Sequence, residues 1–145
     1  MKILESGSEA ETLRIGEDIG QRLHPPRTVL LYGELGSGKT LLTRGLVKGL
    51  GGNDPACVHS PSFTLVNQYS SRKGVIYHID LYRLEGLRDL YSIGLEEILS
   101  EEALVIIEWA EKLLLHPNNP LTIRISVDPT THVRSLEADD QHLRA

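Results

Sequence analysis

Residues 28–40 read TVLLYGELGSGKT, and this stretch indicates the fold class. Its first five residues form a short apolar run rich in strand formers, which predicts a buried central strand. Residues 33–40 match the phosphate-binding pattern Gly-x-x-x-x-Gly-Lys-Ser/Thr. Leucines then recur at positions 42, 46 and 50, the spacing of one helix face, until a pair of glycines stops the pattern. Strand, glycine-rich loop and helix therefore follow in the order that a P-loop NTPase requires.

The loop carries the chemistry of phosphate binding. Its glycines let the backbone curl so that N–H groups point at phosphate oxygens, and the helix that begins near Lys39 adds its positive end. We expect the backbone from Gly36 to Thr40 to bind the triphosphate, Lys39 to reach the β- and γ-phosphates, and the Thr40 hydroxyl to ligate Mg²⁺. Average residue usage gives odds of roughly 0.5% for a chance match in a chain of this length. The alternative, a glycine-rich turn beside a surface lysine, is therefore disfavoured.

The remaining pattern predicts one α/β domain over residues 1–145, with a central, mostly parallel sheet flanked by helices. Ser8 and Glu11 fit a capping box, which predicts a helix from about residue 9 to 23. One or two short helices are expected within 85–99, and the tail after about residue 138 is expected to fray. Apolar, β-prone runs predict further strands at 63–69, 75–80, 104–107, 121–127 and 133–138.

Composition narrows the class of protein. Apolar residues make up 40% and charged residues 24% of the 145 residues, which is typical of a globular domain with a packed core. No apolar run reaches the roughly 18 residues of a membrane span, and the N-terminus has no long apolar signal region. A single cysteine, Cys57, cannot form an internal disulfide, so we expect a cytoplasmic protein without membrane contact. Net charge is −5 and the basic residues are scattered, so any RNA chemistry should proceed through a protein partner.

Two carboxylates stand where a P-loop enzyme needs them. Glu108 ends the apolar run 104–107, the position of the acid that holds Mg²⁺ beside the phosphate loop. Asp80 ends another strand, with His78 two residues earlier on the same face. Metal-linked or water-orienting duty is one interpretation of Asp80, and a turn cap is the other. A solvated strand end remains the alternative for Glu108. The Asp-Glu pair of many ATPases is missing, so one carboxylate must serve the metal or the water unless Asp80 supplies the second.

Two further features lie beside these acids. Residues 59–64 read HSPSFT and stand between the phosphate-loop helix and the next strand, where switch-type NTPases sense the γ-phosphate. The hydroxyls of Ser60 and Ser62 suit that duty, although an ordinary loop is the alternative. Trp109 follows Glu108 and either stacks on a ligand or fills the core.

Taken together, five segments resemble the TsaE (YjeE) family over about residues 6–137. The resemblance implies weak ATP hydrolysis, coupled to the TsaB–TsaD complex. That complex transfers threonylcarbamoyl from its adenylate to N6 of adenosine 37 in tRNAs that read codons beginning with A, and the ATPase is expected to reset it between turnovers. The matching segments are GELGSGKT at 33–40, SPSFTL at 60–65, HIDLYRL at 78–84, IGLEE at 93–97 and IEW at 107–109.

The resemblance also assigns roles to single residues. Glu108 and Thr40 match the Mg²⁺ positions, and Asp80 matches the family's other active-site acid, so Asp80 and Glu108 are the predicted catalytic pair. Thr12 falls in an N-terminal segment near the nucleotide base. Ser37 stands where alanine is usual in the family, and Ser62 where threonine is usual. The predicted nucleotide-binding set is Thr12, Gly36, Ser37, Gly38, Lys39, Thr40, Leu41, Trp109 and Arg134.

Three other functions compete with an ATPase. A Ras-like GTPase would need an Asn-Lys-x-Asp guanine reader, which does not occur. A small-molecule P-loop kinase fits the size but would bring an arginine-rich lid, and none is evident. A non-hydrolysing nucleotide-binding module stays open because the Asp-Glu pair is missing. No arginine finger is evident either, and such a finger is worth about 10³ to 10⁵ in rate, so we expect slow hydrolysis alone and faster hydrolysis with partners.

Overall fold

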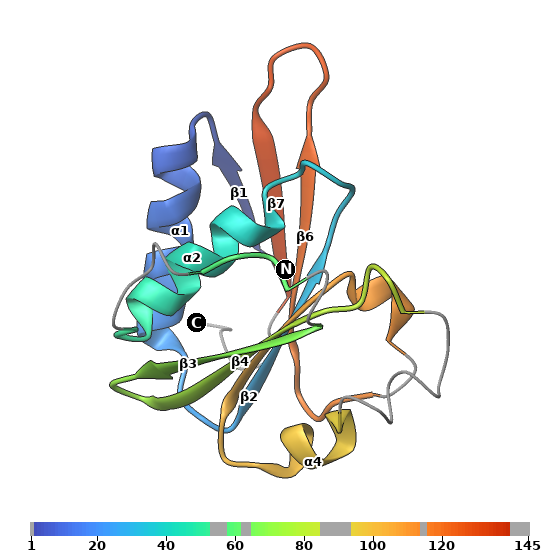
Figure 1. The fold of residues 1–145 in the computed structure, drawn as a ribbon. Coiled ribbons are helices and arrows are strands. Elements are labelled where there is room, and N and C mark those ends of the chain that lie inside the picture. The colour runs from blue at the N-terminus through green and yellow to red at the C-terminus, as the bar shows by residue number, and fades with distance from the viewer. Residues whose placement is uncertain (1, 53–57, 62–64, 85–93, 114–115, 140–145) are drawn as a thin grey trace.

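The computed structural model describes residues 2–52, 58–61, 65–84, 94–113 and 116–139. Within these ranges one seven-stranded sheet has the order β1-β7-β6-β2-β5-β4-β3 (Figure 1). The strands are β1 (Lys2–Ser6), β2 (Arg27–Tyr32), β3 (Val66–Ser71), β4 (Gly74–Asp80), β5 (Leu104–Glu108), β6 (Leu121–Val127) and β7 (Arg134–Asp139). The helices are α1 (Glu9–Arg22), α2 (Lys39–Gly49) and α4 (Leu95–Ser100), with a 3-10 turn η2 (Ala110–Lys112).

The sheet is parallel at its centre and antiparallel at both edges. Strand β2 pairs in parallel with β5 and β6, and β5 pairs in parallel with β4, whereas β1–β7, β6–β7 and β3–β4 are antiparallel. The register sets Leu31 opposite Glu108 and Asp80 opposite Glu108. The carboxyl ends of three parallel strands therefore bring both predicted acids to the edge from which the phosphate loop emerges, as the α/β prediction requires.

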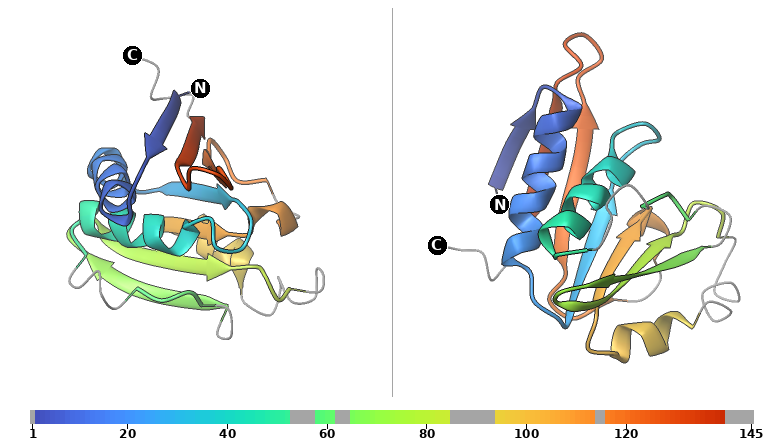
Figure 2. Two further views of the ribbon diagram at one scale, coloured as in Figure 1. Left: turned by 90° about the horizontal axis from the view of Figure 1, so that it is seen from above. Right: turned by 60° about the vertical axis from the view of Figure 1, so that its left-hand side comes forward.

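Helices cover the two faces of the sheet unequally. Figure 2 shows α1 and α2 lying side by side over one face. Alternate residues of the central strands, such as Val29, Leu31 and Ile106, point into the core beneath these helices. The intervening residues, such as Leu30 and Ile107, face a second core formed with α4 and the η2 turn. This alternation explains why β2 and β5 read as continuous apolar runs, since both of their faces are buried.

Glycines allow helices α1 and α2 to approach unusually closely. A Cβ atom built on Gly45 would lie 2.4 Å from the carbonyl oxygen of Leu13, a distance that no real Cβ contact tolerates. The helix–helix contact therefore depends on backbone meeting backbone, and alanine has no room there. The same closeness, with a Cβ at 2.1 to 2.7 Å from a facing backbone oxygen, holds for Gly16, Gly20, Gly45 and Gly49.

The first helix begins where its cap predicts. Ser8 accepts a hydrogen bond from the backbone N–H of Glu11 at 3.1 Å, and the helix then runs from Glu9 to Arg22. The Glu11 carboxylate accepts from the N–H of Gly7 at 3.1 Å, one residue before the position that a reciprocal capping box would use. The predicted helix is thus confirmed, and the N–H groups of Glu11 in its first turn and of Gly7 before the cap both have side-chain acceptors.

Among the described residues the predicted strands are confirmed with two differences, while positions 63 and 64 of the strand expected at 63–69 lie outside these residues. Strand β1 was missed, because its burial is slight and its partner β7 lies at the other end of the chain. The turn expected at residues 70–74 is shorter, since Ser71 pairs with Gly74 and leaves a two-residue connection. Helix α4 confirms the end of the helical segment expected at 85–99, whereas residues 85–93, Cys57 and the tail from residue 140 lie outside the described residues. Among the described helices, none is long and apolar enough to cross a membrane.

Candidate nucleotide and metal site

The phosphate loop links β2 to α2 in a conformation that requires glycine. Gly36 and Gly38 have φ angles of 81° and 109°, in the left-handed region that side chains disfavour. Gly38 caps α2 without a side-chain hydrogen bond, and the helix begins at Lys39. The first N–H groups of α2 therefore have no side-chain acceptor, which is the arrangement that binds phosphate in P-loop proteins.

Lys39 lies against the loop rather than in solvent. Its Nζ donates to the carbonyl oxygens of Gly33 and Glu34, the latter at 3.0 Å, and sits 4.0 Å from the centroid of the Trp109 ring. Burial lowers the pKa of Lys39, and the negative charge of Glu108 partly offsets that effect. These carbonyl oxygens hold the ammonium in place with contacts that phosphate oxygens can replace.

Thr40 and Glu108 form the candidate metal site. The Thr40 hydroxyl donates to Glu108 Oε1 at 3.0 Å and lies 3.3 Å from Oε2. Glu108 is only 2% exposed, and its carboxylate also contacts Nε2 of His78. A hydroxyl and a carboxylate are the hard oxygen ligands that Mg²⁺ takes in nucleotide sites, with phosphates and waters completing the shell. The two predicted metal ligands therefore fit a Mg²⁺ ion.

The described residues contain no cluster of three or more His, Cys, Asp or Glu side chains placed to hold a metal. An all-protein metal cage is therefore not formed by this part of the chain. The pair of Thr40 and Glu108 is typical of a site that is completed by a nucleotide.

Asp80 is buried beside Glu108, and each of its carboxylate oxygens accepts a hydrogen bond. Its Oδ1 accepts from the backbone N–H of Tyr82 at 2.8 Å, which is the predicted turn cap. Its Oδ2 accepts from the Ser60 hydroxyl at 2.7 Å. The predicted turn cap is therefore present, and the same carboxylate also binds the segment that was expected to sense the γ-phosphate. Metal-linked or water-orienting duty for Asp80 stays a prediction. Ser62 of that segment lies outside the described residues.

Trp109 lies at the mouth of the site. It adopts a left-handed conformation with φ of 57°, and its ring is tilted against the ring of Tyr82, with 4.9 Å between centroids. One part of the side chain packs against the core and another faces Lys39. The core interpretation of Trp109 is therefore met in part, and stacking on a ligand stays a prediction.

A cavity of about 300 Å³ opens over these groups. Two predicted members of the nucleotide-binding set do not line it, namely Thr12 and Ser37. Three residues that the sequence did not predict also line the cavity, namely Glu9, Leu35 and Arg44. Glu9 could have been found, because it lies almost one turn before Thr12 at the start of the predicted helix. The full lining is Glu9, Leu35, Gly36, Gly38, Lys39, Thr40, Leu41, Arg44, Glu108, Trp109 and Arg134.

Thr12 and Ser37 are buried at the sides of the site. Thr12 is fully buried, and its Oγ1 lies 2.7 Å from Oγ of Ser6. Ser37 offers its carbonyl oxygen to Nε of Arg134 at 3.0 Å, which places Arg134 beside Gly38. The Ser37 hydroxyl has no hydrogen-bond partner among the described residues. Alanine at this position would therefore lose nothing, in agreement with the residue that is usual in the resembling family.

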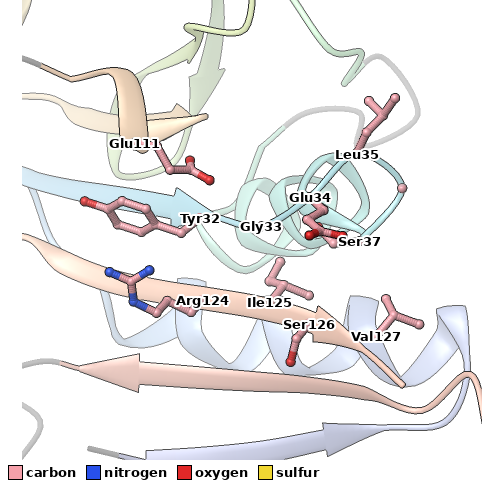
Figure 3. A pocket seen from close by; sticks show the side chains of 11 residues that line it. Tyr32, Gly33, Glu34, Leu35, Ser37, Glu111, Arg124, Ile125, Ser126 and Val127 are labelled. Carbon is pink, nitrogen blue, oxygen red and sulfur yellow. The ribbon is translucent and has the colours of Figure 1, made fainter. Parts of the chain in front are cut away.

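A larger cavity of about 520 Å³ lies on the other side of the phosphate loop (Figure 3). The Arg124 guanidinium lies 4.4 Å from the centroid of the Tyr32 ring, and Glu111 extends toward the same space. Lys39, Thr40 and Glu108 are not part of its lining. Despite its smaller volume, the cavity over Lys39 is the candidate site, because it holds the groups that recognise phosphate and metal.

Comparison with known proteins identifies the family that this chain resembles. The model of the family described as "Threonylcarbamoyl adenosine biosynthesis protein TsaE" matches residues 6–136. Proteins called "tRNA threonylcarbamoyladenosine biosynthesis protein TsaE" include one from Rickettsia conorii, 37% identical over 121 residues, covering 83% of this chain and 67% of the relative. The protein of that name from Aquifex aeolicus is 40% identical over 110 residues, covering 76% of each chain. The crystal structure of YdiB from a Bacillus species superposes with a TM-score of 0.72 at 25% identity, covering 96% of this chain and 84% of YdiB.

Proposed function

The chain belongs to the TsaE family, and from that premise we propose that it binds ATP and hydrolyses it slowly in support of tRNA modification. The modification is N6-threonylcarbamoyladenosine at adenosine 37 of tRNAs that read codons beginning with A. The names of the relatives include tRNA threonylcarbamoyladenosine biosynthesis. The single observation that carries the ATPase part is the contact of Thr40 with Glu108 at 3.0 Å, directly beside Lys39.

Each group of the site has a distinct role in this proposal. The loop N–H groups and Lys39 bind the triphosphate, and Thr40 and Glu108 would hold Mg²⁺. When bound, the ion would neutralise charge on the phosphate oxygens. Asp80, through its hydrogen bond from Ser60, keeps the neighbouring segment against the site and orients the attacking water.

The arginines of the cavity support a slow intrinsic rate. Arg44 donates its Nε to the carbonyl oxygen of Val58 at 3.0 Å, and Arg134 donates its Nε to that of Ser37 at 3.0 Å. Each guanidinium is therefore tied to the backbone, which favours a structural duty over that of an arginine finger. Because such a finger raises rates by about 10³ to 10⁵, we propose that hydrolysis accelerates when the protein meets the TsaB–TsaD complex.

The same proposal covers partners and compartment. The net charge of −5 and the scattered basic residues do not suit a protein that binds tRNA without a partner protein. We therefore propose that tRNA is reached indirectly, through the TsaB–TsaD pair, and that the protein works in the cytoplasm.

Phosphate release from ATP, measured with and without the TsaB–TsaD complex, tests the activity. Wild type should turn over slowly alone and faster with the complex, whereas Glu108→Gln should stop turnover in both settings. Glu102→Gln, an exposed carboxylate just before β5, is the matched control and should behave as wild type. Equal rates with and without the complex would contradict partner activation, and phosphate recovered on a small-molecule acceptor would replace the ATPase by a kinase. Capture of the protein by the immobilised pair only when ATP is present would support the assigned partner.

A further inference from the structure

His78 is a fully buried imidazole at the base of the site, and the roles described above do not use it. It lies on β4 with 0% exposure, within the otherwise apolar run of residues 75–79. Burying a polar ring costs free energy unless its nitrogens are hydrogen bonded. A leucine would fill such a core position without that cost, so the contacts of the ring must explain its presence.

One nitrogen of the ring is directed at the candidate metal ligand. Nε2 of His78 contacts Oε2 of Glu108, while the other carboxylate oxygen, Oε1, accepts from the Thr40 hydroxyl. An ionised carboxylate only accepts hydrogen bonds, so Nε2 must carry the proton of this contact. The carboxylate is thus held from two sides, with one oxygen fixed by His78 and the other turned toward Thr40.

The second nitrogen is held by the edge strand β3. Nδ1 of His78 lies 3.1 Å from the hydroxyl of Tyr69, and Nδ2 of Asn67 approaches that hydroxyl at 3.4 Å. Burial raises the pKa of Tyr69, so its hydroxyl stays protonated and can donate to Nδ1. With both nitrogens engaged, the ring has one orientation, and the order of donors runs from Asn67 through Tyr69 and His78 to Glu108.

We propose that His78, oriented by Tyr69, is a positioning residue that fixes the Glu108 carboxylate for binding of a divalent cation beside Thr40. This inference rests on the proposed function, since it concerns the metal of the same site. Hydrogen bonds to metal-ligating side chains commonly change metal affinity by about 10- to 100-fold when removed. His78 acts through Glu108 and does not itself touch the nucleotide.

The test separates metal binding from nucleotide binding and from hydrolysis. Mn²⁺ affinity of the ADP-saturated protein is measured by electron paramagnetic resonance, and ADP affinity in EDTA is measured by the fluorescence of Trp109, the only tryptophan. His78→Leu should weaken Mn²⁺ binding by about 10- to 100-fold and leave ADP affinity in EDTA within about twofold. His78→Gln, which can keep an N–H donor for Glu108, should recover most of the loss, and Tyr69→Phe should show a smaller loss in the same direction. Tyr77→Phe is the matched control, because its hydroxyl contacts Glu101 on the opposite face.

Defined results would overturn the inference. Wild-type Mn²⁺ affinity in folded His78→Leu would remove His78 from metal binding, and an equal loss of ADP affinity in EDTA would reduce it to a packing residue. Should the leucine variant not fold, unchanged Mn²⁺ affinity in Tyr69→Phe would overturn the proposal in its place. A wild-type protein that binds ADP but no Mn²⁺ would defeat the proposed function together with this inference. If the wild type binds both ADP and Mn²⁺ and the His78 and Tyr69 variants bind Mn²⁺ equally well, the inference fails while the proposed function stands.

Discussion

Replacing Gly45 by alanine tests the close contact between helices α1 and α2. Gly45 lies inside α2, where helix propensity alone favours alanine over glycine by about 1 kcal/mol. Its Cβ would, however, lie 2.4 Å from the carbonyl oxygen of Leu13, whereas ordinary contact begins at 3.4 Å. Helix propensity would stabilise the alanine variant and the close contact would destabilise it. The sign of the change in the free energy of unfolding therefore shows which effect is larger.

The magnitude follows from the distance that the helices must separate. Restoring ordinary contact at Gly45 requires roughly 1 Å, and gaps of about 0.5 to 1 Å forfeit a quarter to a half of each dispersion contact. Overpacking of this kind costs about 1 to 3 kcal/mol, and here a backbone oxygen rather than a flexible side chain must give way. Because backbone must move, we take the upper end of this cost, about 3 kcal/mol, and subtracting the propensity gain of about 1 kcal/mol leaves a net loss of about 2 kcal/mol. Such a loss lowers Tm by about 4 to 8 °C in a domain of this size.

Urea unfolding and calorimetry measure this change. The matched control is Gly7→Ala, where the nearest facing atom lies 3.9 Å from the new Cβ and the free energy of unfolding should stay within about 0.5 kcal/mol. Because α2 begins with Lys39 and Thr40, Gly45→Ala should also weaken nucleotide binding. A Gly45→Ala protein as stable as wild type, or more stable, would refute the reasoning from helix contact.

Three further predictions concern the site. Lys39→Ala removes a buried ammonium that would make charge-assisted hydrogen bonds to phosphate, each worth about 1.5 to 3 kcal/mol, so ATP affinity by calorimetry should fall at least about tenfold. An unchanged dissociation constant would place the phosphates elsewhere. Glu108→Ala should retain ATP binding in EDTA while phosphate release stops, and undiminished turnover would remove Glu108 from the mechanism. Ser37→Ala deletes a buried hydroxyl that has no partner among the described residues, so the free energy of unfolding should rise by about 1 kcal/mol. A loss of stability there would mean that the hydroxyl is hydrogen bonded in solution.

Local patterns in the sequence were sufficient for most of the fold. The capping residues at Ser8, the apolar run before Gly33 and the leucine spacing of α2 each depend on residues a few positions apart, and each predicted element is present. Strand β1 escaped prediction because it is short and its burial is slight. Its pairing with β7 joins the two ends of the described chain, and no local signal marks such a contact.

The candidate site likewise has a part that local sequence predicts and a part that it does not. The phosphate loop, with Lys39 and Thr40, is a local motif, and Glu108 and Asp80 were recognisable as acids that end buried strands. Other contacts of the site were not recognisable, because His78 meets Glu108 across 30 positions and Arg134 meets Ser37 across 97.

The sequence by itself determined the class of fold, the phosphate-binding loop and the candidate acids, since these follow from periodicity and from a motif whose members are neighbours in the chain. Only the tertiary structure decided which groups surround those acids, and how closely α1 and α2 approach. The physical reason is that such contacts depend on strand order and register. These are set by the burial of whole faces of the sheet rather than by the pattern of any one segment.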